Sequence, residues 1–294
     1  MKHEKHLPLL DYCRFAAAAG VLCFHYFWNG IGNGKLSSLD HVDALTVWAR
    51  YGYLGVDLFF MISGYVIFMS ARHRSATQFA VGRLLRLYPA YLFAMLTTAC
   101  VAHFLGAGGT AVTLRQVLGN LLMYQPLHHQ RYVDGVYWTL MIEIRFYGAV
   151  AILLALGLQR RLGLIATLWP LVMLAALATG RGGWLDPHRG ERLLAGGYYA
   201  FFASGALLAM LREKQAATTW LALAASTLLG LRYAVGLAGA EAGGPADPAQ
   251  PWVTGAIVLS FTPLFLAVNA SAGRIRRLPL ATTLGALTYP LYLV

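Results

Sequence analysis

The sequence predicts an all-α fold: a polytopic transmembrane helix bundle with about nine helices visible of ten, and with its N-terminus in the cytoplasm. Of the 294 residues, 58% are hydrophobic and 12% are charged, whereas a soluble domain has about 25% charged residues. A soluble chain with so few charges could not cover its own surface, so much of that surface must face lipid. The net charge of +11 comes from short basic clusters between apolar stretches, which favours membrane topology over nucleic-acid binding.

Apolar stretches of about 20 residues are long enough to cross a bilayer as helices. The chain contains such stretches at 8–28, 51–71, 88–107, 137–158, 162–179, 193–211, 217–237, 252–271 and 279–294. The connections between them are short and polar, except for longer loops at 29–50, 108–136, 180–192 and 238–251. No internal repeat is visible, so we expect one domain over residues 1–294.

The first and last stretches need separate arguments. The first resembles a signal peptide because Lys2 and Lys5 precede it, but it contains Asp11 and Arg14 and lacks a convincing cleavage site. We therefore expect a retained membrane helix. The last stretch, 279–294, forms only about 24 Å of helix, less than the ~30 Å hydrocarbon core. We therefore expect the native chain to continue beyond residue 294 into a tenth helix.

Basic residues set the orientation of the bundle. With the N-terminus inside, the short inner segments carry Lys2, Lys5, Arg72, Arg74, Arg83, Arg86, Arg160, Arg161, Arg212, Lys214, Arg274, Arg276 and Arg277. The outer loops carry fewer, namely Lys35, Arg50, Arg115, Arg131, Arg181, Arg189 and Arg192. Short cytoplasmic loops are enriched in Lys and Arg, so the N-terminus is predicted to lie in the cytoplasm.

The first helix contains three ionisable residues, Asp11, Arg14 and His25, and each such group is costly in lipid. Arg14 and His25 are eleven positions apart, about 1100° of helical rotation, so they share a face about 16 Å apart along the axis. Asp11 lies one turn from Arg14. These residues can also be interpreted without a catalytic role. Asp11 and Arg14 would then form an ion pair at the helix end, and His25 would form a hydrogen bond to another helix.

Asp57 in the second helix and Glu143 in the fourth are also predicted to lie in the outer half of the membrane. Together with His25 they favour one polar pocket, in which a carboxylate orients a histidine that acts as general base. Ser63 and Gly64, in contrast, are small residues typical of close helix packing. Cys13, Cys23 and Cys100 lie in apolar stretches without paired spacing. We therefore expect neither a disulfide nor a metal site.

Arg83 and Arg86 lie on one face of an expected interfacial helix at the cytoplasmic side, after Arg72. The simpler reading is anchoring to anionic headgroups. The alternative is a clamp for the phosphates of a cytosolic cofactor, since guanidinium groups suit phosphate oxygens.

With these motifs the sequence resembles the acyltransferase-3 family of membrane O-acyltransferases. The resemblance rests on Arg14 and His25, on Gly-Val-Asp57-Leu-Phe-Phe with Ser63-Gly-Tyr, and on Arg83-Leu-Leu-Arg86-Leu-Tyr-Pro. It extends to Trp138-Thr-Leu with Glu143 and Phe146-Tyr147, and to Leu284-Gly-Ala-Leu-Thr-Tyr-Pro. The polar residue and final helix that follow this last tract in the family are absent here. The similarity covers essentially the whole chain.

The resemblance implies a multi-pass enzyme of the cell inner (plasma) membrane. It implies transfer of an acyl group, usually acetyl, from cytosolic acyl-CoA to a hydroxyl of a cell-surface or lipid-linked carbohydrate, with no tightly bound cofactor. Arg83 and Arg86, with Arg72, would hold the phosphates of CoA. His25 would act as general base or carry the acyl group, with Glu143 or Asp57 orienting it and Arg14 nearby. The expected partners are acyl-CoA, a carbohydrate acceptor and the bilayer.

Two other interpretations remain from the sequence. A multi-pass transporter could use His25, Asp57 and Glu143 as a polar relay, although no repeated halves or broken helices are visible. A structural or sensory membrane protein would not need all three side chains. Within enzymes, His129 and Asp134 show the spacing of glycerolipid acyltransferases, but we interpret it as coincidence because it falls in an expected outer loop.

Overall fold

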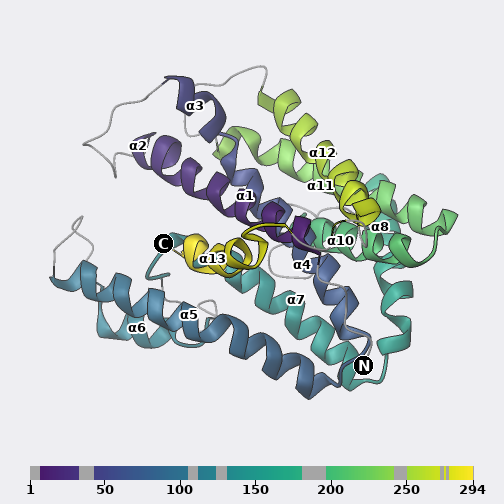
Figure 1. The fold of residues 1–294 in the computed structure, drawn as a ribbon, viewed down its shortest axis with the longest axis horizontal. Helices are drawn as coiled ribbons and strands as arrows, with labels where there is room; N and C mark the ends of the chain where they lie inside the picture. Colours follow the sequence, from purple (N-terminus) through teal and green to yellow (C-terminus); the bar gives the residue numbers. More distant parts are fainter. Residues whose placement is uncertain are drawn as a thin grey trace.

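The computed structural model describes residues 7–32, 43–104, 112–123, 131–180, 197–241, 250–271, 275 and 278–293. The long helices in these ranges are α1 (Pro8–Phe24), α4 (Gly55–Ala71), α5 (Ala76–Phe104), α7 (Trp138–Ala155), α8 (Leu162–Ala178), α10 (Tyr198–Glu213), α11 (Ala217–Glu241), α12 (Gln250–Ser271) and α13 (Ala281–Leu293). Shorter helices are α2 (Gly30–Gly32), α3 (Asp43–Ala49) and α6 (Leu114–Asn120). No strand occurs in the described ranges, which confirms the all-α prediction (Figure 1).

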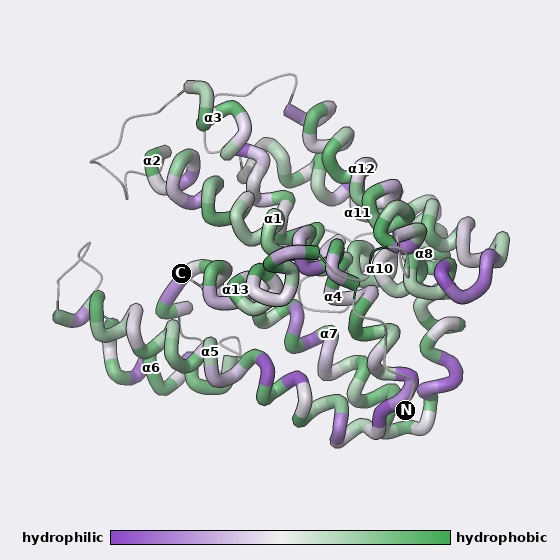
Figure 2. The backbone as a smooth tube through the Cα atoms, in the orientation of Figure 1, coloured by the Kyte–Doolittle hydropathy of each residue, from purple (hydrophilic) through white to green (hydrophobic). Residues whose placement is uncertain are grey.

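The helices are those of a multi-pass membrane protein. Six helical segments of the described chain are long and apolar enough to cross a membrane. Hydrophobic residues run along the helices, and hydrophilic stretches lie mainly at their ends (Figure 2). Large apolar side chains such as Phe93 (75% exposed) and Phe104 (80% exposed) point out of the bundle, as expected where lipid replaces water.

Three predicted elements differ from the structure. The loops expected at 29–50 and 108–136 contain the short helices α3 and α6. The third difference is the start of a spanning helix. We expected a membrane helix at 88–107, preceded by a separate interfacial helix carrying Arg83 and Arg86. The structure instead has the single 29-residue helix α5, with Pro89 inside it. Proline commonly ends helices in water, but membrane helices tolerate it because neighbouring groups satisfy the backbone groups that it frees. The two arginines therefore lie on the same continuous helix as the predicted span, and Arg83 is buried.

Glycines allow α4 and α10 to approach closely at the centre of the bundle. A Cβ atom on Gly64 would lie 2.0 Å from the carbonyl oxygen of Phe202, and one on Gly205 would lie 1.9 Å from that of Met61. Only glycine fits at such a contact between helix backbones. The packing role predicted for Gly64 is confirmed.

Helix α13 lies between α1 and α5 (Figure 1). The Tyr12 hydroxyl donates a hydrogen bond to the carbonyl of Pro279, just before α13. The Tyr289 hydroxyl donates to the carbonyl of Leu87 on α5 at 3.1 Å. A Cβ atom on Gly285 would lie 2.9 Å from Cγ of Asp11, so α13 touches α1 closely. These contacts close one side of the cavity described next.

Candidate active site

A small cavity of about 90 Å³ lies between α1, α4, α5, α7 and α13. We call it the arginine cavity, because three arginines line it. Its polar lining residues are Arg14, Arg83, Arg86, Ser63, Glu143, Tyr147, Tyr289, Thr139 and Thr288. Three guanidinium groups around one membrane cavity form a strongly cationic site, and cations in a membrane interior are costly without a function or a partner.

Two of the three arginines are held in place by other side chains. Nη1 of Arg14 donates to Oδ1 of Asp11 at 2.9 Å, the ion pair that the sequence predicts. Nη2 of Arg83 donates to Oγ of Ser70 at 2.7 Å, and its guanidinium lies 5.5 Å from the ring centre of Tyr147. The Arg86 side chain is exposed. The cavity therefore has two fixed cations and one that is accessible from outside.

Glu143 also lines the arginine cavity. The Ser63 hydroxyl donates a hydrogen bond of 2.9 Å to Oε1 of Glu143, and the Tyr147 hydroxyl donates to the same oxygen. We predicted a packing role for Ser63, and the structure shows a hydrogen bond that this prediction did not include. Tyr147 follows Glu143 by one helical turn, so the i, i+4 spacing could have indicated that contact.

A second cavity of about 260 Å³ contains the histidine and is called the His25 cavity. Its polar lining residues are His25, Asn29, Tyr53, Asp57, Asp134, Thr139, Trp138 and Tyr198. His25 begins a π-helical segment, His25–Asn29, at the end of α1, and such segments are frequent at functional sites. The segment widens the helix where two of its side chains, His25 and Asn29, line the cavity.

Two carboxylates share the His25 cavity. Asp57 lies in the first turn of α4 and is 4% exposed. A negative charge there is favoured by the positive end of the helix dipole. Asp134 lies just before the 3₁₀ turn Gly135–Tyr137, and its Oδ1 accepts a hydrogen bond of 3.2 Å from the Val136 amide. We predicted no site role for Asp134, and nothing in its spacing from His25 indicates that the two share a cavity.

The two cavities adjoin, because Val56 and Thr139 line both of them. The structure thus brings His25 and Asp57 together as expected, but it places Glu143 in the neighbouring arginine cavity. Ser63, the partner of Glu143, follows Asp57 by six residues on α4, which is about 9 Å along the helix. Glu143 consequently lies deeper in the bundle than the other two side chains.

Two further predicted residues lie elsewhere. Nη1 of Arg72 donates to Oε2 of Glu213 at 2.5 Å in a partly exposed ion pair, and Arg72 does not line the arginine cavity. His129 lies outside the described residues. Within the described ranges, no group of three or more His, Cys, Asp or Glu residues is arranged to hold a metal ion.

Comparison with known proteins identifies a family and a relative. The model of a family described as an acyltransferase domain matches residues 7–294. The protein named "Putative peptidoglycan O-acetyltransferase YrhL" of Bacillus subtilis (strain 168) is 26% identical over 200 residues, which cover 60% of this chain. The match spans 28% of the length of that relative. No solved structure shows a significant match.

Proposed function

The chain belongs to the acyltransferase family that its sequence matches over residues 7–294, and we propose that it is an O-acyltransferase of the cell inner membrane. It transfers an acetyl group from cytosolic acetyl-CoA to a hydroxyl of a cell-surface or lipid-linked carbohydrate. The observation that carries the proposal is the contact between two cavities. One is lined by Arg14, Arg83 and Arg86, and the other by His25 and Asp57.

The arginine cavity is assigned to the donor. CoA carries several phosphate groups, and arginine binds phosphate oxygens through paired hydrogen bonds. The cavity volume of about 90 Å³ equals roughly three water molecules in the liquid, so only an acetyl-sized group fits inside it. The larger part of the donor has to contact the exposed side, where Arg86 lies.

The His25 cavity is assigned to the acceptor. The imidazole of His25 takes the proton of the acceptor hydroxyl, and the hydroxyl oxygen attacks the thioester carbonyl carbon. The carbon–sulfur bond breaks, and the proton passes from His25 to the departing thiolate, so that CoA leaves as the thiol. In a second route an imidazole nitrogen attacks the thioester carbonyl, the carbon–sulfur bond breaks, and the thiolate leaves with the imidazole proton. The acceptor hydroxyl then attacks the acetyl-imidazole, the carbon–nitrogen bond breaks, and the hydroxyl proton returns to the imidazole. Asp57 or Asp134 orients the ring in either route.

A carbohydrate acceptor is supported by the Bacillus subtilis relative, whose name refers to peptidoglycan O-acetylation. The His25 cavity suits such a substrate chemically. Carboxylates, an amide and hydroxyl groups line it, and these groups accept and donate the hydrogen bonds that sugars make. The acceptor of this chain is proposed only as a glycan hydroxyl.

The test is acetyl transfer in membranes. Membranes containing the wild-type chain, His25→Ala or His103→Ala are supplied with radiolabelled acetyl-CoA, and label in the surface glycan is measured. His103 is the matched control because it is exposed at the end of α5 and lines neither cavity. We expect wild type and His103→Ala to incorporate label, and His25→Ala to lose at least 100-fold, the lower range of general acid–base catalysis.

Each other outcome removes part of the proposal. Full incorporation by His25→Ala would make His25 a packing residue. Incorporation from another labelled acyl donor, but not from acetyl-CoA, would refute the donor assignment. An acetylated histidine trapped by rapid acid quenching would select the acyl-histidine route over general base catalysis.

A further inference from the structure

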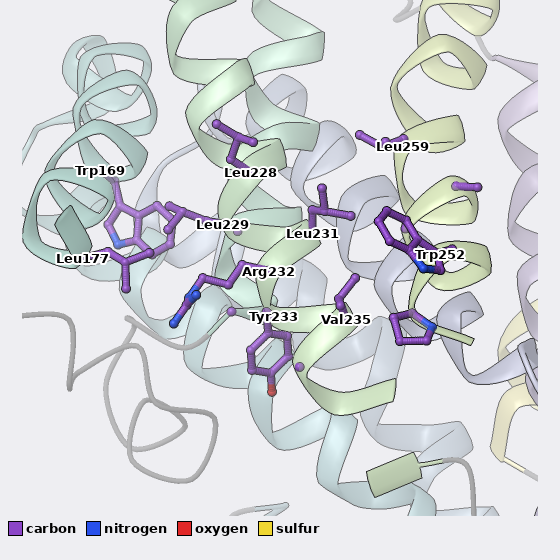
Figure 3. A pocket seen from close by; sticks show the side chains of 16 residues that line it. Trp169, Leu177, Leu228, Leu229, Leu231, Arg232, Tyr233, Val235, Trp252 and Leu259 are labelled. Carbon is purple, nitrogen blue, oxygen red and sulfur yellow. The ribbon is translucent and has the colours of Figure 1, made fainter. Parts of the chain in front are cut away.

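A third cavity lies on the other side of α11 from the His25 cavity. It has a volume of about 1120 Å³ and lies between α8, α10, α11 and α12 (Figure 3). Its walls are mainly apolar and include Trp169, Leu177, Leu228, Leu231, Val235 and Leu259. We call it the α11 groove. It exceeds the ~300–1,000 Å³ of ordinary small-molecule pockets and offers almost no polar groups to a soluble ligand.

Arg232 is the single charged residue among the described residues that line the α11 groove. It lies on α11 within the candidate membrane span Ala217–Ala238, and its side chain is exposed to the groove rather than covered by protein. Figure 3 shows it extending from α11 towards the side where Trp169 and Leu177 lie. Within the described residues Arg232 makes no hydrogen bond or ion pair. A cation inside the membrane is costly without a counter-charge. A negatively charged ligand is therefore expected in the groove.

We propose that the α11 groove binds an anionic glycerophospholipid of the bilayer, with its phosphate against Arg232. The guanidinium of arginine matches a phosphate group in charge and geometry, and the leucine-rich walls match acyl chains. Trp252, at the start of α12, lines the same groove and is 81% exposed. Tryptophan is enriched at the level of lipid headgroups, so it marks the end of the groove where the headgroup lies.

The proposed lipid site shares a wall with the candidate active site. Ala234 and Leu237 of α11 line the His25 cavity, whereas Arg232 and Val235 line the groove. The Tyr233 ring completes this wall by packing edge-on against the Tyr198 ring, with 4.7 Å between the ring centres. A bound phospholipid therefore supports, from behind, the helix that forms one side of the His25 cavity.

The test measures retained lipid on purified protein. Wild type, Arg232→Gln and Arg232→Lys are purified in mild detergent after incubation with vesicles of equal phosphatidylglycerol and phosphatidylethanolamine, and the bound lipids are quantified by mass spectrometry. The matched control is Arg160→Gln, an exposed charge removed outside the groove. Wild type, Arg160→Gln and Arg232→Lys are expected to retain phosphatidylglycerol preferentially. In Arg232→Gln the ratio of retained phosphatidylglycerol to phosphatidylethanolamine is expected to fall about fivefold. This corresponds to ~1 kcal/mol for one basic residue near an anionic membrane surface.

A second variant tests the groove by shape. Ala256 lines the groove and is exposed, so Ala256→Trp should fill the space and reduce the total retained phospholipid without changing any charge. The proposal is overturned if Arg232→Gln keeps the wild-type preference, or if Ala256→Trp retains as much lipid as wild type. It is also overturned if an equimolar polyprenyl phosphate displaces phosphatidylglycerol, since the occupant is then a lipid carrier. Because no activity is measured, these outcomes are independent of the proposed acetyl transfer.

Discussion

The hydroxyl of Ser63 on α4 donates a hydrogen bond of 2.9 Å to Oε1 of Glu143 on α7. The Tyr147 hydroxyl donates to the same oxygen, so two neutral donors satisfy a carboxylate oxygen in the middle of the bundle. Hydrogen bonds to charged groups are stronger than those between neutral groups. This contact joins two spanning helices beside the three arginines.

Replacing Ser63 with alanine should weaken acetyl transfer. The variant removes one hydrogen bond to a charged acceptor, worth about 1.5–3 kcal/mol, so we expect transfer to fall roughly 10- to 100-fold. Ser260→Ala is the control, since the Ser260 hydroxyl donates to the Ile257 carbonyl on the exposed side of α12. Equal rates of glycan labelling for Ser63→Ala and wild type would show that the position of Glu143 does not depend on this contact.

Replacing the arginines of the arginine cavity should weaken donor binding more than replacing Arg72. Arg83→Gln and Arg86→Gln each remove a cation from the arginine cavity, and we expect the KM for acetyl-CoA to rise at least tenfold, the equivalent of ~1.4 kcal/mol. Arg72→Gln should change it less than twofold because Arg72 is paired with Glu213 outside that cavity. The measurement is the KM for acetyl-CoA of each variant, from steady-state kinetics on membranes. A larger effect from Arg72 than from Arg83 would mean that the phosphates bind elsewhere.

The two carboxylates of the His25 cavity should contribute unequally. Asp57 is buried, so we expect Asp57→Asn to lower kcat about 100-fold by removing the charge that orients the imidazolium. Asp134→Asn should have a smaller effect, because an oxygen of Asp134 already accepts the Val136 amide and an asparagine oxygen keeps that hydrogen bond. The comparison requires kcat at saturating donor. The reverse order of effects would assign the orienting role to Asp134.

The α4–α10 contact should be intolerant of a single methyl group. Gly64→Ala and Gly205→Ala each place a Cβ atom about 2 Å from a backbone oxygen of the facing helix. Overpacking of this kind costs roughly 1–3 kcal/mol, so both variants should unfold at lower temperature in detergent. Gly148→Ala is the control, since no atom lies within 4 Å of its Cβ position. If all three variants melt like wild type, the helices can separate at little cost.

The sequence by itself determined the fold class and the positions of the long helices. A spanning helix needs about 20 apolar residues, and this local requirement is visible wherever the chain meets it. Local spacing likewise predicted the ion pair between Asp11 and Arg14, which are one turn apart on α1. The predicted start of α5 was wrong, because proline usually interrupts a helix but Pro89 lies inside this one.

Only the tertiary structure decided which side chains meet. Spacing along one helix defines the rotation and depth of a residue on that helix, but not how far a neighbouring helix is displaced along its own axis. Glu143 therefore lies with the arginines rather than with His25, while Asp134, from a connecting segment, shares the His25 cavity. Arg72 was likewise expected near the other arginines, but it pairs with Glu213 because the end of α4 lies beside the end of α10. These placements depend on contacts between residues 80 to 141 positions apart in the chain, a separation at which sequence periodicity contains no information.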